Sequence, residues 1–218
     1  MRLVLIALVG CCLGAGPATP PPTPPTTPTP PTPPAARPRA TTRPTAARPP
    51  RVRDALENGS VRFLVPADWK LVERTDDGLR VRYDLPDGRG FVSMQVAVQQ
   101  QALPARDEGV RKRLAEVVLR SVAQNLAERN VEMVDPPRVE YEEPFMAKIH
   151  ERFREGGTFS DAVHAYRGVG IFLVNVLAVS TSEDRQEAKA VHEAGTFMLM
   201  SVTTGPKDLK LVRPLPKD

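Results

Sequence analysis

Cysteine is nearly absent from this chain of 218 residues, which contains only Cys11 and Cys12. The region that follows them can form no disulfide and offers no thiolate ligand to a metal. Histidine is also scarce, and His150, His164 and His192 are the only soft ligands that remain. The sequence has no nucleophile elbow, phosphate-binding glycine loop or paired-histidine zinc motif. These absences predict a protein that is not an enzyme and that carries no metal or cofactor.

A long apolar run is missing as well. After Arg2, the apolar stretch Leu3–Val9 is far shorter than the roughly 20 residues that span a membrane. A short apolar run behind a positive charge is typical of a secretory signal. The run ends in Leu8-Val9-Gly10-Cys11, which resembles the lipobox of bacterial lipoprotein precursors. This resemblance implies that residues 1–10 are a signal peptide and that Cys11 becomes the N-terminal residue, carrying fatty acyl chains such as palmitate.

Lipidation at Cys11 would fix the protein to a membrane. Each buried methylene group contributes about 0.8 kcal/mol, so several acyl chains together hold stably where one does not. The expected location is therefore the bacterial cell envelope, with the membrane as a partner through the lipid at Cys11. The alternative is an ordinary secretory signal cut after Ala15 or Gly16, although that site lacks a good Ala-x-Ala pattern.

Acidic residues are absent before Asp54. Seven of the 30 basic residues and none of the 26 acidic ones precede it, so the rest of the chain has 23 basic against 26 acidic residues. A mildly acidic domain on an exported chain argues against nucleic acid as a partner, since nucleic-acid binding needs a basic face. Two interpretations of the arginines from Arg37 to Arg53 stay open: attraction to an anionic membrane or cell-wall surface, or solvation of the segment.

Proline and threonine dominate the segment after the signal. Residues 17–53 cannot pack a core, which predicts a disordered linker behind the lipidated residues 11–16. Fully extended, this linker reaches roughly 115 Å at about 3.1 Å per residue. A spacer is the favoured role, and binding to an aromatic-lined groove or glycosylation of its threonines are the alternatives. A globular domain over residues 54–204 and a charged tail over residues 205–218 are expected to follow.

Alternating apolar and polar residues predict an antiparallel meander in the first part of the domain. The expected strands are residues 61–65, 69–73, 79–84 and 92–98, with turns at Asp76-Asp77-Gly78 and Pro86-Asp87-Gly88. The period then becomes helical over residues 107–129.

A second set of strands is expected after Asp135-Pro136-Pro137, which should break the chain. These strands are residues 138–142, 145–154, 159–167 and 170–180. The two strands beside Gly156-Gly157 place apolar residues at odd positions, which favours a three-residue loop and keeps His164 away from Ile149. The last strand is apolar at nearly every position, so both of its faces should be buried.

A final helix, with Thr181 or Ser182 as its cap, is expected to cover one face of the sheet. The earlier helix would cover the other face. The predicted fold is therefore α+β: an antiparallel sheet of about six to eight strands with a helix on each face, an α/β/α sandwich.

The order of a strand meander, a long helix, a second meander and a C-terminal helix resembles the PsbP-like superfamily. That superfamily includes the extrinsic photosystem II subunit P, a eukaryotic Ran-binding import factor and many bacterial lipoproteins. The segment Val65-Pro66-Ala67-Asp68-Trp69-Lys70 is similar to the proline-x-x-tryptophan opening common among the bacterial members. The resemblance spans about residues 58–204. It implies a binding or assembly subunit without a shared catalytic residue set.

Three residues are candidates for contact with a ligand or a partner: Trp69, His150 and His164. Trp69 marks a ligand pocket in one interpretation, but its position after a strand-ending proline favours a cap on the core. His150 and His164 are expected on one sheet face, near Glu140 or Glu142. A metal site there is the less favoured interpretation, because polar residues commonly line the boundary between a helix and a sheet.

Ser160, Asp161 and His164 suggest a catalytic triad, but on a strand Asp161 points away from the other two. The predicted function is therefore that of a lipid-anchored envelope protein whose non-catalytic domain binds another envelope protein. The alternatives are a small-molecule carrier or sensor with a cleft near Trp69, a hydrolase with a dispersed site, and a purely structural envelope component.

Overall fold

The computed structural model describes residues 50–86, 88–104, 106–129 and 131–216. The predicted signal peptide, Cys11 and the predicted linker up to residue 49 lie outside the described residues. The strands are β1 (Arg51–Leu56), β2 (Val61–Pro66), β3 (Lys70–Arg74), β4 (Arg80–Asp84), β5 (Gly90–Val98), β6 (Glu132–Glu140), β7 (Ala147–Glu155), β8 (Thr158–Val169), β9 (Phe172–Ser180) and β10 (Thr203–Thr204). The helices are α1 (Glu108–Glu128) and α2 (Arg185–Met200), and the short 3-10 helices are η1 (Glu57–Gly59) and η2 (Leu209–Leu211).

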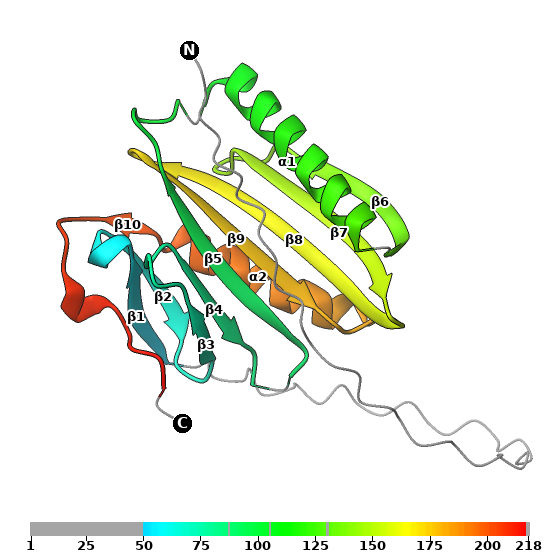
Figure 1. Ribbon diagram of the computed structural model, residues 1–218, viewed down its shortest axis with the longest axis horizontal. Coiled ribbons are helices and arrows are strands. Elements are labelled where there is room, and N and C mark those ends of the chain that lie inside the picture. The colour runs from blue at the N-terminus through cyan, green and yellow to red at the C-terminus, as the bar shows by residue number, and fades with distance from the viewer. Residues whose placement is uncertain (1–49, 87, 105, 130, 217–218) are drawn as a thin grey trace, which may run out of the picture. The chain divides into compact units, whose positions relative to one another are not determined.

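Seven strands form one antiparallel sheet in the order β3-β4-β5-β9-β8-β7-β6 (Figure 1). The first meander and the second therefore meet where β5 pairs with β9. Most residues of β9 are buried, as its continuous apolar sequence predicts for a strand covered on both faces. The predicted α+β fold and the number of strands are confirmed.

The two helices cover opposite faces of this sheet. In β9, Val174, Val176 and Ala178 belong to the core under α2, whereas Leu173 and Val179 belong to the core under α1. Helix α1 packs chiefly against β7, and α2 crosses β9 on the other side (Figure 1). No helix in the described ranges combines the length and the apolar composition needed to cross a bilayer.

A second sheet, in the order β1-β2-β10, was not among the predicted elements. The sequence predicts residues 61–65 as part of the first meander, but β2 pairs with β1 and β10 instead. Strand β1 begins at Arg51, within the stretch predicted as linker. Its later residues, Ala55 and Leu56, are apolar and fully buried, and their burial attaches this strand to the domain. Phe63 of β2 packs in the same core as Met198 of α2, so the small sheet and α2 share one face of the large sheet.

Aspartates cap both helices. The side chain of Asp107 accepts a hydrogen bond from the backbone at the start of α1, and Asp184 does so at the start of α2. The second cap replaces the predicted Thr181 or Ser182. The hydroxyl of Ser182 instead donates to Oε2 of Glu187 at 2.7 Å.

Edge strand β6 includes the prolines at which the sequence predicts that the chain leaves regular structure. Pro136 and Pro137 lie within the strand, and its register against β7 shifts on both sides of Asp135. Proline removes a backbone donor, which an edge strand tolerates because one of its sides has no neighbour. The prolines and the register shifts also blunt this edge against pairing with a further strand.

The turn between β7 and β8 contradicts the predicted three-residue loop. Gly156 and Gly157 alone connect the paired residues of the two strands. Both have positive φ, 55° and 84°, as a type I′ turn requires, and this turn matches the twist of a hairpin. The register therefore differs by one residue from the prediction, and His164 lies opposite Ile149.

The first part of the predicted C-terminal tail, residues 205–218, makes hydrogen bonds with the domain. Gly205 and Asp208 donate backbone hydrogen bonds to the carbonyls of Ser60 and Asn58, at 3.0 and 2.9 Å. These carbonyls lie in and beside η1, outside the strand ladders, so they need partners from elsewhere in the chain. The segment from Gly205 onward thereby becomes part of the domain.

Gly195 lets α2 approach the large sheet closely. A Cβ atom at this position would lie 2.7 Å from Cβ of Ala178 and 3.3 Å from Cγ1 of Val176, both in β9. We expect Gly195→Ala to lower the free energy of unfolding by about 1 to 2 kcal/mol, because overpacking outweighs the gain in helix propensity. Chemical denaturation measures this change.

Gly109→Ala in α1 is the matched control. Its Cβ would meet only the ends of two side chains, Oδ1 of Asp107 at 3.2 Å and Nη1 of Arg113 at 3.5 Å. This variant should be neutral or slightly stabilising. Equal destabilisation by the two substitutions would contradict a specific close contact at Gly195.

Candidate functional site

The three predicted contact residues lie in three different places. Trp69 precedes β3, and its side chain is buried in the core that α2 and the small sheet share. Its backbone N–H donates to the carbonyl of Pro66 at 3.3 Å. The predicted cap on the core is confirmed, and the indole is surrounded by other core side chains.

His150 and His164 lie on opposite faces of the large sheet, which contradicts the prediction that they share one. His164 lies opposite Ile149, which belongs to the core under α1, and His150 lies opposite Val163 on the other face. The cause is the two-residue turn, because a shift of one residue moves every side chain of a strand to its other face. No site can therefore combine these two histidines.

Beneath α1, His164 forms a buried pair with Glu151. Nε2 of His164 lies 3.0 Å from Oε1 of Glu151, and the carboxylate is largely buried. Its second oxygen, Oε2, has no hydrogen-bond partner among the described residues. Burial raises the pKa of the neighbouring Tyr166, and the charge of Glu151 adds to this rise. The pair offsets part of the cost of two polar groups that the register places in an apolar core.

Ser160 lies too far from His164 for a triad. The two share the face under α1, but they are four positions apart along the strand, which amounts to about 13 Å. Asp161 lies on the opposite face, 3.3 Å from Nε2 of His192 in α2. The prediction that these residues do not form a triad is confirmed.

On the face that α2 partly covers, β6, β7 and β8 present a group of charged residues, which we call the polar face. It consists of Asp135, Arg138, Glu140, Lys148, His150, Arg152, Arg154 and Asp161. Most of its cations are paired with acids. Arg152 contacts Asp135 at 2.8 Å and Asp161 at 3.2 Å, and Lys148 contacts Glu140 at 3.5 Å.

Arg138 is the exception on the polar face. It is exposed, lies directly opposite His150, and makes no ion pair with any residue that the structure describes. By contrast, Arg154 contacts Glu183 at 2.6 Å. Arg138 is therefore a cation on the edge strand β6 whose charge no ion pair with a described residue balances.

His150 and His192 meet where the polar face ends at α2. Their rings stand edge to face with centroids 5.7 Å apart. Nε2 of His192 lies 3.1 Å from the carbonyl oxygen of Asp161, whereas Nε2 of His150 has no hydrogen bond and lies 3.7 Å from Glu140. Burial lowers the pKa of His150, Glu140 opposes this shift, and Lys148 and His192 add to it.

The described residues contain no group of three or more His, Cys, Asp and Glu side chains that could hold a metal ion. The two neighbouring imidazoles lie beside the acids Glu140 and Asp161, 3.7 and 3.3 Å from their carboxylate oxygens.

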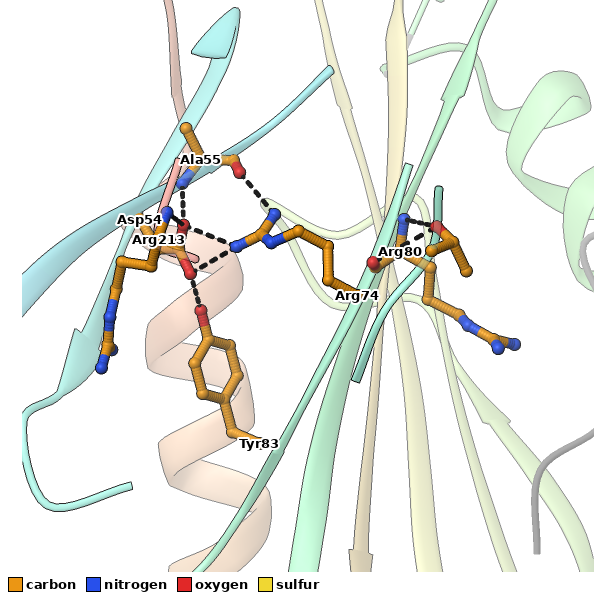
Figure 2. Close-up of polar contacts among 7 residues, drawn as sticks. Asp54, Ala55, Arg74, Arg80, Tyr83 and Arg213 are labelled. Atoms are coloured by element: carbon orange, nitrogen blue, oxygen red, sulfur yellow. Dashed lines mark hydrogen bonds and ion pairs between the residues drawn. The ribbon is translucent and has the colours of Figure 1, made fainter. Parts of the chain in front are cut away.

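A further cluster, around Asp54, was not predicted (Figure 2). The residue is 0% exposed, and Nη2 of Arg74 donates to its two oxygens at 2.8 and 2.7 Å. The hydroxyl of Tyr83 donates to Oδ2, and the backbone N–H groups of Ala55 and Arg213 donate to Oδ1 at 2.7 and 2.9 Å. Burial raises the pKa of Tyr83, and the charge of Asp54 adds to this rise. Asp54 thereby joins β1, β3, β4 and the C-terminal segment.

One signal in the sequence points to Asp54. It is the first acid of the chain and stands directly before Ala55 and Leu56, the first buried apolar residues of the domain. The contact with Arg213 leaves no such signal, because a backbone N–H makes it and any residue except proline supplies that group.

The described part is thus an α+β domain whose ionisable side chains lie in separate pairs and clusters. Neither a family model nor a curated protein matches the sequence. The chain is similar to the solution structure of cyanobacterial PsbP (CyanoP) from Synechocystis sp. PCC 6803, with a TM-score of 0.47 and 12% identity over 76% of this chain and 98% of that one. It is also similar to a crystal structure from Bacteroides thetaiotaomicron, with a TM-score of 0.44 and 11% identity over 74% of this chain and 50% of that one.

His150 should give the stability of the domain a pH dependence of defined sign. Because burial lowers its pKa below the ordinary 6.5, the folded protein binds fewer protons than the unfolded chain in mildly acidic solution. The free energy of unfolding should therefore fall as the pH drops through 6.5. In His150→Gln this fall should be shallower between about pH 7 and pH 5, as denaturation at each pH will show.

The control compares the free energy of unfolding of the wild type and of His150→Gln at about pH 8, where His150 is neutral in both the folded and the unfolded state. The difference that remains at that pH reports the packing of the new side chain alone. Parallel pH profiles for the two proteins would show that His150 does not contribute.

Proposed function

We propose that this chain is a lipid-anchored envelope lipoprotein whose non-catalytic domain binds another envelope protein through the polar face. In this proposal the lipid on Cys11 holds the chain to the membrane, and the Pro/Thr-rich residues 17–49 act as a spacer. The observation that carries the proposal is the unbalanced charge of Arg138.

Arg138 supports docking of a partner with an acidic group. It is exposed opposite His150, whereas the neighbouring cations of the polar face are held by acids. A guanidinium binds a carboxylate through two parallel hydrogen bonds, which fixes orientation as well as adding affinity. Charges held in place by paired strands also suppress wrong partners, since like charges would face each other.

The separation of reactive groups favours binding over catalysis. A nucleophile needs a base within hydrogen-bond reach, but Ser160 and His164 are about 13 Å apart along β8. Glu151 and His164 face the apolar side chains of α1. The carrier alternative gains no support from Trp69, whose indole is buried in the core. The sequence resemblance to the PsbP-like superfamily implies a binding or assembly role as well.

Membrane anchoring is tested by Cys11→Ser. We expect this variant to move from the membrane fraction to the soluble fraction, because no acyl chain can be attached to the serine in place of the thiol. Cys12→Ser is the matched control and should stay with the membrane. Membrane fractionation followed by immunoblotting measures both, and a Cys11→Ser protein that stays membrane-bound would contradict the anchor.

Partner binding is tested by photo-cross-linking in intact envelopes. Glu132, which is exposed at the start of β6 and lies opposite Arg154 on the polar face, is replaced by a photoreactive aromatic residue. We expect a cross-linked protein whose yield falls at least roughly tenfold when Arg138→Glu is added, because a charge reversal makes the contact with an acid repulsive.

The control places the same photoreactive residue at Val117, which is 41% exposed on α1 and far from the polar face in sequence. The specific product should be missing there. A product that forms equally at both positions, or that survives Arg138→Glu, would argue against docking on the polar face.

A further inference from the structure

Residues 205–216, which we call the strap, follow β10 and return to the first strand of the domain. Figure 1 shows this segment in red, passing beside β1 on its way to the C-terminal end. The strap contains η2, whose first turn is capped by the side chain of Asp208. It contacts the domain around η1 near its start and at Asp54 near its end. Near its start, Nη2 of Arg62 also donates to the carbonyl of Pro206 at 2.9 Å, and Nζ of Lys207 lies 3.4 Å from Glu57.

The strap is attached to the domain mainly by hydrogen bonds of its backbone atoms. The N–H groups of Gly205 and Asp208 donate to carbonyls in and beside η1, at 3.0 and 2.9 Å. The N–H of Arg213 donates to Oδ1 of Asp54 at 2.9 Å. A hydrogen bond to a charged group is worth more than one between neutral groups, so the bond from Arg213 to Asp54 is stronger than either backbone bond at η1.

Gly59 makes the first contact point possible. Its φ is +88°, and a Cβ atom there would lie 2.1 Å from the carbonyl oxygen of Asp208. The backbone of the strap therefore lies directly against η1. Any side chain at this position would push the strap away.

The strap buries little apolar surface. No residue of η2 is buried, Leu209 is 69% exposed and Leu215 is 43% exposed. In addition, Nη1 of Arg213 is buried without a hydrogen-bond partner, which costs free energy in the docked state. Segments with few buried contacts open at a lower free energy than the core of a domain does. The strap should therefore open while the seven-stranded sheet stays folded.

We propose that the strap is a releasable latch on β1. Strand β1 is at the edge of the small sheet and pairs only with β2, so the bond from Arg213 to Asp54 is what ties it to the other end of the chain. When the strap leaves, β1 loses this tie and separates from β2 more readily. Its six residues, Arg51–Leu56, would then lengthen the preceding segment by about 20 Å. This inference does not depend on what the polar face binds.

Arg213→Pro tests the latch, because proline lacks the N–H that Asp54 accepts. Hydrogen exchange on the full-length chain, followed by mass spectrometry, should show peptides that cover β1 exchanging at least roughly tenfold faster. Peptides that cover β9 should keep the wild-type rate. Arg213→Ala is the matched control, since it keeps the N–H and removes only the guanidinium, and its β1 peptides should stay at the wild-type rate.

Gly59→Ala tests the other contact point without touching Asp54. Its matched control is Gly157→Ala, because Gly157 has a similar φ of +84° but no atom within 4 Å of the added Cβ. We expect faster exchange of β1 in Gly59→Ala and not in Gly157→Ala. Exchange of β1 that stays at the wild-type rate in both Arg213→Pro and Gly59→Ala overturns the proposal, and so does exchange that accelerates equally in β1 and β9.

Discussion

A single buried carboxylate joins parts of this domain that are far apart in the sequence. Asp54 is fully enclosed, and a carboxylate without water is stable only when hydrogen-bond donors surround it. Arg74, Tyr83 and Arg213 supply those donors from β3, β4 and the C-terminal segment. The charge can therefore be buried only after all of these segments have assembled. Docking of the small sheet on the large one depends on this condition.

Local pattern is enough to predict most of the elements but not the sheet that each strand joins. The helical period of α1 and the continuous apolar sequence of β9 both follow from the residues themselves. Strand β2 alternates as strictly as β4 does, and nothing in its own sequence says that it pairs with β1 and β10. That choice depends on partners outside the strand, one of which is more than 100 positions away in the pairing of Thr203 with Arg62. Strand β1 escapes prediction because its buried half is short and follows a run of arginine and proline.

The candidate site depends on a register that periodicity could not decide. Strand β8 has apolar residues on both faces, with Ala162 and Tyr166 on one and Val163 and Ala165 on the other. Either face could therefore have been turned toward α1. The choice is made by Gly156-Gly157, which form a two-residue turn and thereby place His164 beside Glu151. The residue types at the site could be predicted, whereas their grouping required the turn geometry.

The position of Asp54 in the strand order decides where the two described ends of the chain are attached to the large sheet. Asp54 ties β1 to β3 and β4, at one edge of the large sheet, while β6 and β7 lie at the opposite edge. Four strand spacings separate β4 from β7, which is about 19 Å. Both described ends of the chain are thus attached at one edge, and Arg138 and His150 stand at the other. If the chain is anchored through Cys11 as proposed, a pull on the N-terminal segment acts on the edge with β3 and β4, while the edge with β6 and β7 stays free to meet a neighbour.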